Sequence, residues 1–394
     1  MRVREEARTL GGPILTRPFR VLAALILVAA ILIVWRLVAG LGATTALSDA
    51  YPWGLWIAFD VVTGTALACG GYSMAILVYV LNKGRYHPLV RPAILTSALG
   101  YTVAGISIAL DIGRPWIAWK VPLFVWSWNL NSALLEVSLC IMTYTAVAWI
   151  ELSPALLERW QRESRLRKIA AKARAILDRS LVWIIAFGLL LPTMHQSSLG
   201  TLMVLTGPKL HPLWQTRLLP LLFLVSCIAI GYAAVVFEST LASVFFRRPR
   251  ETEMLAGLSG AMVPVLGAFL AIRIGGLAIR GRLPLALAPN RYALAFWVET
   301  ALMAAPLFLL LPAGRRRDPG NLFRAAMMML LAGALYRFNT YLLAYRAGDD
   351  VHYFPSVPEF LITVGLLALE VLGYIVIVKL FPIFSGAPRR AVPT

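Results

Sequence analysis

The chain has 394 residues, of which 59% are hydrophobic and only 14% carry a charged side chain. Its mean hydropathy is +0.75, whereas about a quarter of the residues in a typical soluble domain are charged. The composition excludes an ordinary soluble enzyme and indicates an integral membrane protein. The excess of 37 basic over 19 acidic residues does not indicate nucleic-acid binding, because most basic residues fall in short gaps between apolar runs.

Ten apolar runs are long enough to cross the hydrocarbon core, which takes about 20 residues. The runs cover residues 21–40, 53–81, 92–112, 125–150, 181–205, 217–240, 254–279, 291–312, 321–345 and 356–381. None shows the short alternating segments of a membrane barrel, and the first lacks a signal-peptide cleavage site. We therefore predict an all-α integral membrane protein with about ten transmembrane helices within residues 21–381.

The distribution of Lys and Arg predicts the orientation in the membrane. Twenty-five fall at the two chain ends and in every second gap, against eight in the other gaps. By the positive-inside rule, residues 1–20 and 382–394 are then cytoplasmic tails. The long gap at residues 152–180 is basic and has apolar residues at helical spacing, so we predict an amphipathic helix on the cytoplasmic membrane surface. A solvated linker is an equal alternative.

Ionisable groups inside apolar runs cost several kcal/mol unless they are paired or hydrated, so each is a candidate functional residue. Among those that lie there are Asp60, Asp111, Glu136, Glu238, Glu299, Glu370, Arg273, Arg337 and His195. A helical rise of about 1.5 Å per residue predicts that Asp60, Asp111 and His195 share a pocket toward the periplasm. The same estimate puts Glu136 near the middle of the membrane and Glu238 near the cytoplasmic end.

A polar pocket with carboxylates spaced below it is the arrangement that quinone reduction needs, because the reaction takes up protons as well as electrons. The candidate quinone-binding residues are His195, Asp60, Asp111, Arg114 and Gln196, and the candidate proton-transfer residues are Glu136, Glu238 and Glu370. Structural alternatives exist for several of them. Asp111 can pair with Arg114, Glu299 can pair with Arg273 or Arg337, and His195 can serve as a polar helix-packing contact.

Metal and haem sites are not predicted in this chain. The three cysteines stand alone in separate runs, without the spacing of a zinc or iron–sulfur site. A membrane b-type haem generally needs two facing axial ligands, and His195 is the only histidine predicted at membrane depth.

Several longer motifs resemble a known family. They are YPWGLWIAFD at 51–60, YHPLVRPA at 86–93, LDIGRPW at 110–116, NLNSALLE at 129–136, LLPTMHQSSLG at 190–200 and KLHPLWQ at 209–215. These segments resemble the HybB-type membrane subunit, the so-called cytochrome b subunit, of periplasm-facing nickel–iron uptake hydrogenases, within the NrfD/PsrC superfamily. The resemblance covers nearly the whole chain.

The resemblance implies two four-helix bundles, spans two to five and six to nine, flanked by spans one and ten. It also implies a bacterial inner-membrane subunit without haem that reduces menaquinone or ubiquinone at a site near the periplasm. Its partners would be a periplasmic ferredoxin-like iron–sulfur subunit and the hydrogenase small and large subunits, which hold the clusters and the nickel–iron centre. A molybdopterin oxidoreductase or multihaem cytochrome partner is one alternative, and a secondary transporter is another.

Overall fold

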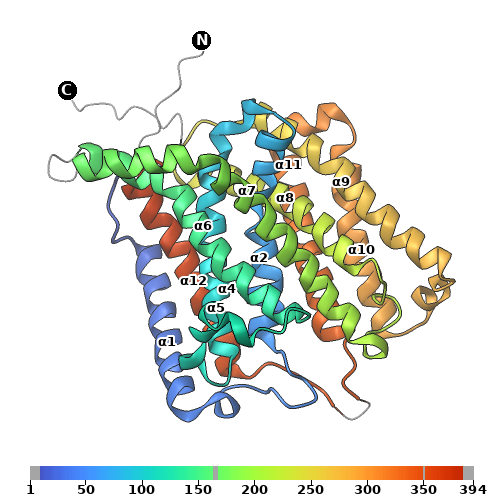
Figure 1. Cartoon of the computed structure of the whole chain (residues 1–394). Helices are drawn as coiled ribbons and strands as arrows, with labels where there is room; N and C mark the ends of the chain where they lie inside the picture. Colours follow the sequence, from blue (N-terminus) through green and yellow to red (C-terminus); the bar gives the residue numbers. More distant parts are fainter. Residues whose placement is uncertain (1–8, 163–166, 349–350, 385–394) are drawn as a thin grey trace.

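The computed structural model describes residues 9–162, 167–348 and 351–384. Within these residues the chain forms ten helical rods and no extended strand (Figure 1). The rods are α1 (Arg17–Ala39), the broken helix η2–α2–α3–η3 (Trp56–Val80), η4–α4 (Gly84–Asp111), α6 (Ala133–Arg162), α7 (Arg167–Leu205), α8 (Leu219–Phe245), α9 (Thr252–Ile279), α10 (Arg291–Leu310), α11 (Pro319–Phe338) continued by η10 (Asn339–Leu343), and α12 (Val357–Leu380). The predicted fold class is confirmed.

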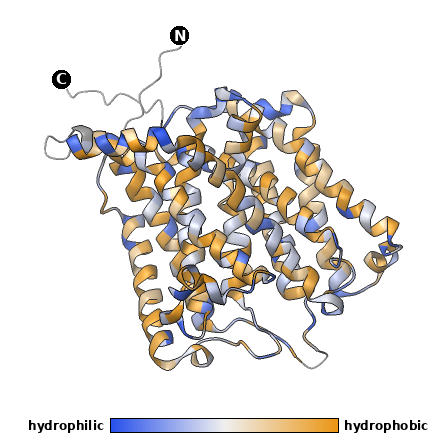
Figure 2. Cartoon of the chain, viewed as in Figure 1, coloured by the Kyte–Doolittle hydropathy of each residue, from blue (hydrophilic) through white to orange (hydrophobic). Residues whose placement is uncertain are grey.

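Nine of the ten described rods are long and apolar enough to span a membrane, and α11 is the exception. It packs against α8 and α10, and its buried Arg337 lowers the hydropathy of the rod. Hydrophobic residues make up most of the middle of the rods, while hydrophilic residues gather toward their ends (Figure 2). Leu10 and Leu380 lie at one end of the bundle, which we call the terminal end, and the opposite end is the distal end.

The predicted gap at residues 152–180 is divided between two helices. Helix α6 continues to Arg162, and α7 runs without interruption from Arg167 to Leu205. At about 1.5 Å per residue, the 39 residues of α7 reach about 58 Å, far more than the hydrocarbon core is thick. Its first part accordingly crosses the terminal end of the bundle before the helix turns inward (Figure 1). The position of this part on a membrane surface stays a prediction. Residues 163–166 and the outer parts of both predicted tails lie outside the described residues.

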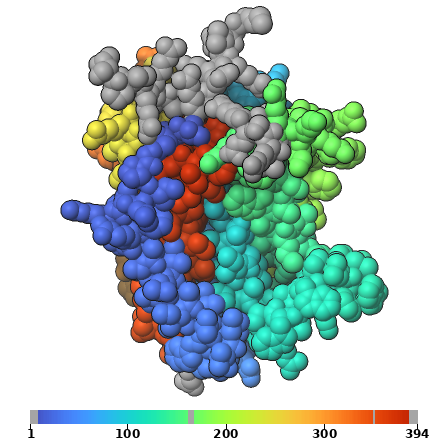
Figure 3. Space-filling model, turned by 90° about the vertical axis from the view of Figure 1, so that its left-hand side faces the viewer, coloured from blue at the N-terminus to red at the C-terminus, as the bar shows by residue number. Residues whose placement is uncertain are grey.

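The fourth predicted span begins later than its apolar run. Residues 115–127, which we call the aromatic segment, form only short helical turns, and α6 starts at Ala133. Pro115 and Pro122 interrupt a continuous helix here. Trp116 and Trp126 are 63% and 76% exposed, and the segment projects from the body of the molecule (Figure 3). Tryptophan at this level of a bundle is typical of a membrane–water interface.

Helices α8, α9, α10 and α11 pack on one another as one group, and the broken helix, α4, α6 and α7 form the other. Helix α12 packs against α4, and α1 covers α12 from outside (Figures 1 and 3). Contacts of α8 with α3 (Gly70–Ala75), a part of the broken helix, and with α7 join the two groups. We call the group with the broken helix the first group and the group with α8 the second group. The rods of the first group, together with α12, surround most of the residues predicted for the site.

The contact of α1 with α12 depends on Gly365. A Cβ atom at this position would lie 2.1 Å from Cβ of Ala29 and 3.0 Å from the carbonyl oxygen of Leu25. Gly365→Ala is therefore expected to destabilise the protein by about 1–3 kcal/mol, because α1 must move outward. The matched control is Gly267→Ala, since the Gly267 position on α9 has no atom within 4 Å and Ala favours a helix. Thermal unfolding in detergent measures both, and equal unfolding temperatures for the two variants would contradict the packing argument.

Candidate functional site

His195 lies on α7 and its side chain is fully buried. Its Nε2 atom is 3.0 Å from the hydroxyl oxygen of Thr65 on α2 (Gly64–Leu67). Gln196, also fully buried, donates from its own Nε2 to the same hydroxyl over 3.1 Å. The ring of Tyr101 on α4 packs edge-on against the imidazole, with 5.7 Å between ring centroids. Three rods of the first group therefore meet at His195.

The hydrogen bonds of Thr65 show which nitrogen of the His195 ring carries the proton. The hydroxyl of Thr65 donates its single proton to the carbonyl oxygen of Val61, 2.6 Å away. It therefore acts as acceptor toward Gln196 and toward Nε2 of the neutral ring. Nδ1 of His195 keeps a free lone pair. Neither this atom nor Oε1 of Gln196, both buried, has a hydrogen-bond partner in the described part of the chain. An unmade hydrogen bond of this kind costs about 1–3 kcal/mol, so the position favours a ligand that supplies donors.

Asp60 lies in the π-helical segment η2 (Trp56–Thr63) and is 3% exposed. Its Oδ2 accepts a hydrogen bond from Ser107 on α4 over 3.2 Å and another from Thr363 on α12 over 3.0 Å. Its Oδ1 is buried, and no hydrogen-bond partner for it is found among the described residues. Segments of π-helix are rare and occur frequently at functional sites.

Two further carboxylates continue from Asp60 along the interface between α4 and α12. Glu370 on α12 faces Gly100, where a Cβ atom would lie 2.6 Å from Cβ of Ala68 and 3.2 Å from Oε1 of Glu370, so the glycine leaves room for both neighbours. The charge of Glu370 interacts with those of both Asp60 and Glu238. Glu238 on α8 accepts a hydrogen bond from Thr96 on α4 over 2.8 Å. We call Asp60, Glu370 and Glu238 the carboxylate row.

The carboxylate row follows the helical repeat of both flanking helices. On α12 its contacts come from Thr363, Glu370 and Tyr374, and the hydroxyl of Tyr374 donates to Oε1 of Glu238 over 2.6 Å. On α4 the contacts come from Ser107, Gly100 and Thr96, with the same spacing of seven and four residues in reverse order. Such residues lie on one face of a helix. The row spans about 16 Å along the bundle at the helical rise of 1.5 Å per residue.

The single pocket predicted for Asp60, Asp111 and His195 does not form. Asp60 lies level with Ser107, whereas His195 lies level with Tyr101, about 9 Å farther from the distal end along α4. Asp111 closes α4 at the distal end itself. The sequence estimate placed the three groups together because it measured depth from the ends of separate apolar runs, and these ends do not fix the relative height of neighbouring helices.

Asp111 has a different basic neighbour from the one predicted. Arg114 is exposed, and no ion pair joins it to Asp111 within the residues described. Instead Arg36 on α1, which is 1% exposed, interacts electrostatically with Asp111. The Arg36 guanidinium also donates to the carbonyl oxygens of Leu110 and Ile112, at 2.8 and 2.6 Å, where α4 ends. A cation at a helix C-terminus is stabilising.

Glu136 lies in the first turn of α6, near the distal end, and not in the middle of the membrane as predicted. The shift follows from the late start of α6 after the aromatic segment. One face of α6 leads from Glu136 through Cys140 to Tyr144, with steps of four residues. The ring of Tyr144 packs on that of Tyr101 with 4.4 Å between centroids, and so connects this face to the surroundings of His195.

The second group of helices contains a buried ion pair. Arg273 on α9 pairs with Oε1 of Glu299 on α10, and both side chains are at most 3% exposed. The same carboxylate accepts hydrogen bonds from Trp214 over 3.1 Å and from Asn339 over 2.6 Å. These contacts pair and hydrogen-bond Glu299, as a buried charge requires.

Arg337 does not join that pair, although the sequence analysis left this pairing open. Its guanidinium donates to the carbonyl oxygen of Val62 in η2 over 3.2 Å and to that of Phe223 on α8 over 2.9 Å. It also acts electrostatically on His195. Arg337 therefore holds the π-helical segment against the second group and places a positive charge near the imidazole.

Thr65, Tyr101 and Glu359 are among the side chains that sequence reasoning missed and that the structure brings into these networks. Thr65 and Tyr101 carry no distinctive signal, because both residue types are common in membrane helices. Glu359 did carry one: Ser356 and Glu359 have the spacing of a capping box, and both hydrogen bonds of the box are present at the start of α12. Glu359 also accepts hydrogen bonds from Ala46 and Tyr353, at 2.9 and 2.6 Å, and so ties the distal loops together.

Comparison with known proteins places these features in a family context. The family described as "Polysulphide reductase, NrfD" matches residues 43–345, which include eight of the ten rods and most of the residues discussed above.

Three curated relatives illustrate the range of similarity. The "Probable Ni/Fe-hydrogenase 2 b-type cytochrome subunit" of Escherichia coli (strain K12) is 41% identical over 383 residues, 96% of this chain and 95% of that protein. The "Menaquinone reductase, integral membrane subunit" of Nitratidesulfovibrio vulgaris (strain Hildenborough) is 34% identical over 161 residues, 41% of this chain and 37% of that protein. The "Hdr-like menaquinol oxidoreductase integral membrane subunit" of Archaeoglobus fulgidus is 25% identical over 382 aligned positions, 88% of this chain and 88% of that protein.

Proposed function

The chain belongs to the polysulphide reductase NrfD family, and on that premise we propose that it is the quinone-reducing membrane subunit of a respiratory nickel–iron hydrogenase complex. Hydrogen is oxidised in partner subunits, which releases two electrons and two protons per molecule. Iron–sulfur clusters of the partners pass the electrons to this chain, where menaquinone or ubiquinone takes up two electrons and two protons and becomes quinol. Atoms and charges balance over the whole reaction.

The observation that carries the proposal is the pair of orphaned acceptors at His195 and Gln196. A quinol hydroxyl donates a hydrogen bond, and Nδ1 of neutral His195 or Oε1 of Gln196 is available to accept it. When the imidazole is protonated, Nδ1–H donates to a quinone carbonyl instead. The ring can therefore bind both redox forms and transfer the proton between them.

The other predicted quinone-binding residues lie nearer the distal end. We propose that Asp60, which lies in η2, supplies protons close to the site, and that Asp111 and Arg114 line the approach from the distal surface. Asp111 has a buried Oδ1 that lacks a hydrogen-bond partner in the described part of the chain. A free acceptor of this kind suits an entrance for the polar headgroup of the quinone.

Proton supply is the proposed role of the carboxylate row. Glu238 lies about 10 Å from the end of α8 at the terminal end, and Glu370 stands between it and Asp60. Carboxylates and hydroxyls in sequence are the usual groups of a proton relay through a membrane. Glu136 stays a proton-transfer candidate on a second branch, along the α6 face that ends at Tyr144 and Tyr101.

We also propose an orientation in the membrane and a set of partner subunits for this chain. The distal end faces the periplasm, where a ferredoxin-like iron–sulfur subunit and the small and large hydrogenase subunits dock, and both termini are in the cytoplasm of a bacterial cell. The chain itself carries no haem, although its relative in E. coli is described as a b-type cytochrome subunit. His87, His211 and His352 lie outside the buried interior, and only His195 is fully buried.

Purification of the native complex through an affinity tag on this chain tests the proposal. We expect nickel and iron in the complex, and hydrogen oxidation coupled to reduction of a soluble menaquinone analogue. The tagged chain expressed alone is expected to show no haem absorption. A molybdenum-containing partner would instead support the alternative in which the same membrane fold serves a molybdopterin oxidoreductase. A chain that purifies without any redox partner would contradict both.

A further inference from the structure

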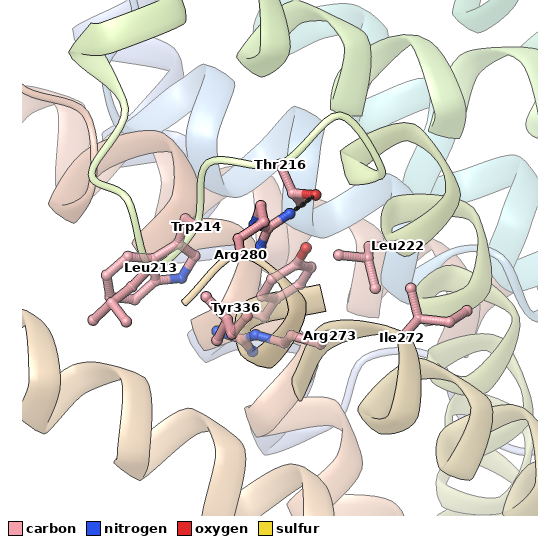
Figure 4. A pocket seen from close by; sticks show the side chains of 9 residues that line it. Leu213, Trp214, Thr216, Leu222, Ile272, Arg273, Arg280 and Tyr336 are labelled. Atoms are coloured by element: carbon pink, nitrogen blue, oxygen red, sulfur yellow. Dashed lines mark hydrogen bonds between the residues drawn. The ribbon is translucent and has the colours of Figure 1, made fainter. Parts of the chain in front are cut away.

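A small cavity lies in the second group of helices, apart from the proposed quinone site. It lies between the distal loop that contains Trp214 and Thr216 and the last turns of α9, with Tyr336 of α11 as its third wall (Figure 4). Its volume open to a water-sized sphere is about 10 Å³, which is about the room that one water molecule or one small ion needs.

The polar atoms left unsatisfied around this cavity include hydrogen-bond donors from three side chains. Nη1 of Arg273, Nε of Arg280 and the hydroxyl of Tyr336 are all buried, and none has a hydrogen-bond partner among the described residues. All three residues line the cavity. Other atoms of the two guanidinium groups already have partners: Arg273 binds Glu299, and Arg280 donates to Thr216.

The charge around the cavity is positive. Glu299 balances Arg273, but no carboxylate lies within ion-pair distance of Arg280 in the described ranges of the chain. Arg282, two residues farther on, adds a second positive charge that acts on Arg280. The phenol ring of Tyr336 also supports Arg273, whose guanidinium carbon lies 4.8 Å from the ring centroid.

An occupant must satisfy several donors and offset a positive charge within the volume of one small particle. A water molecule accepts only two hydrogen bonds, whereas three side chains offer buried, unpaired donors here, and a water carries no charge to offset that of Arg280. A halide ion accepts from all directions, needs no acceptor and carries the compensating charge. We propose that this cavity is a binding site for a single small monovalent anion of the size of chloride.

The anion would act as part of the structure of the distal end. By bridging Arg273, Arg280 and Tyr336 it would join the end of α9 to α11, and through Thr216 to the loop before α8. This inference is independent of the quinone proposal, because the cavity shares no residue with the His195 site.

Equilibrium binding of radiolabelled chloride to the purified full-length chain tests the site. We expect about one ion bound per wild-type chain, and an unfolding temperature about 2 °C higher in sodium chloride or bromide than in sodium gluconate at the same sodium concentration. Arg280→Gln and Tyr336→Phe are each expected to weaken binding at least tenfold. Tyr336→Phe removes only the hydroxyl and keeps the ring that packs on Arg273.

Arg217→Gln is the matched control. It removes a positive charge from the exposed part of the same loop, outside the cavity, and is expected to bind chloride as the wild type does. Absence of bound chloride in the wild type, or equal binding by the wild type and Tyr336→Phe, would overturn the proposal and leave the cavity to water. Chloride binding by the wild-type chain tests the site even if a variant fails to fold.

Discussion

His195→Ala is expected to lower hydrogen-to-quinone activity of the assembled complex by at least about 100-fold, the lower range of what a general acid–base group contributes. The variant removes the imidazole whose Nδ1 stands free to bind and protonate the quinone oxygen. Hydrogen-to-dye activity should stay unchanged, because the dye takes its electrons from the partner subunits. The measurement is the ratio of the two activities in membranes that contain equal amounts of complex.

Two further variants separate chemistry from packing at His195. Thr65→Val removes the hydroxyl that fixes the proton on Nε2 but keeps the shape, and about a tenfold loss of the same activity is expected, because both ring tautomers then become accessible. His87→Ala, at an exposed position near the terminal end, is the control and should have no effect. Full quinone activity in His195→Ala would remove this residue from the mechanism.

The rods were predictable because each depends on a local property, a long apolar run. The boundary error at the start of α6 arose where hydropathy cannot distinguish two environments. The predicted run begins at residue 125 and includes the last residues of the aromatic segment, which are apolar but lie exposed at the end of the bundle. Hydropathy measures transfer from water and does not report whether the backbone continues as a helix.

The candidate site was predictable only in part, for a different physical reason. His195 and the acidic residues could be selected from the sequence because charge at membrane depth is costly wherever it occurs. Their grouping depends on which helices touch. Glu370 showed no link to other residues until α12 was found beside α4, and Arg337 turned out to bind backbone carbonyls, which leave no trace in a sequence. Depth estimated from the ends of apolar runs misplaced Glu136 and the relative levels of Asp60 and His195, and the direction of each side chain could not be estimated at all.

Glu238→Gln is expected to lower hydrogen-to-quinone turnover at least about tenfold while dye reduction is retained. The amide has the size of the carboxyl group: its oxygen can accept from one of the hydroxyls of Thr96 and Tyr374, and its NH2 group can donate to the other. Because the amide does not relay a proton, the effect reports proton transfer and not folding. Glu253→Gln is the matched control, because Glu253 is an exposed carboxylate near the start of α9. It should leave turnover unchanged.

The double variant Glu238→Gln with Glu370→Gln shows whether the row works as one path. If protons pass through both carboxylates in series, the second substitution adds little to the first, because the path is already interrupted. If the two groups serve separate paths, the losses multiply, to about 100-fold for two tenfold effects. We expect the series result, since Glu370 stands between Glu238 and Asp60 and its charge interacts with both. If the two losses multiply, the carboxylates of the row do not act in one path. The same two activities, hydrogen-to-quinone and hydrogen-to-dye, would then be measured for variants of Glu136 and the α6 face.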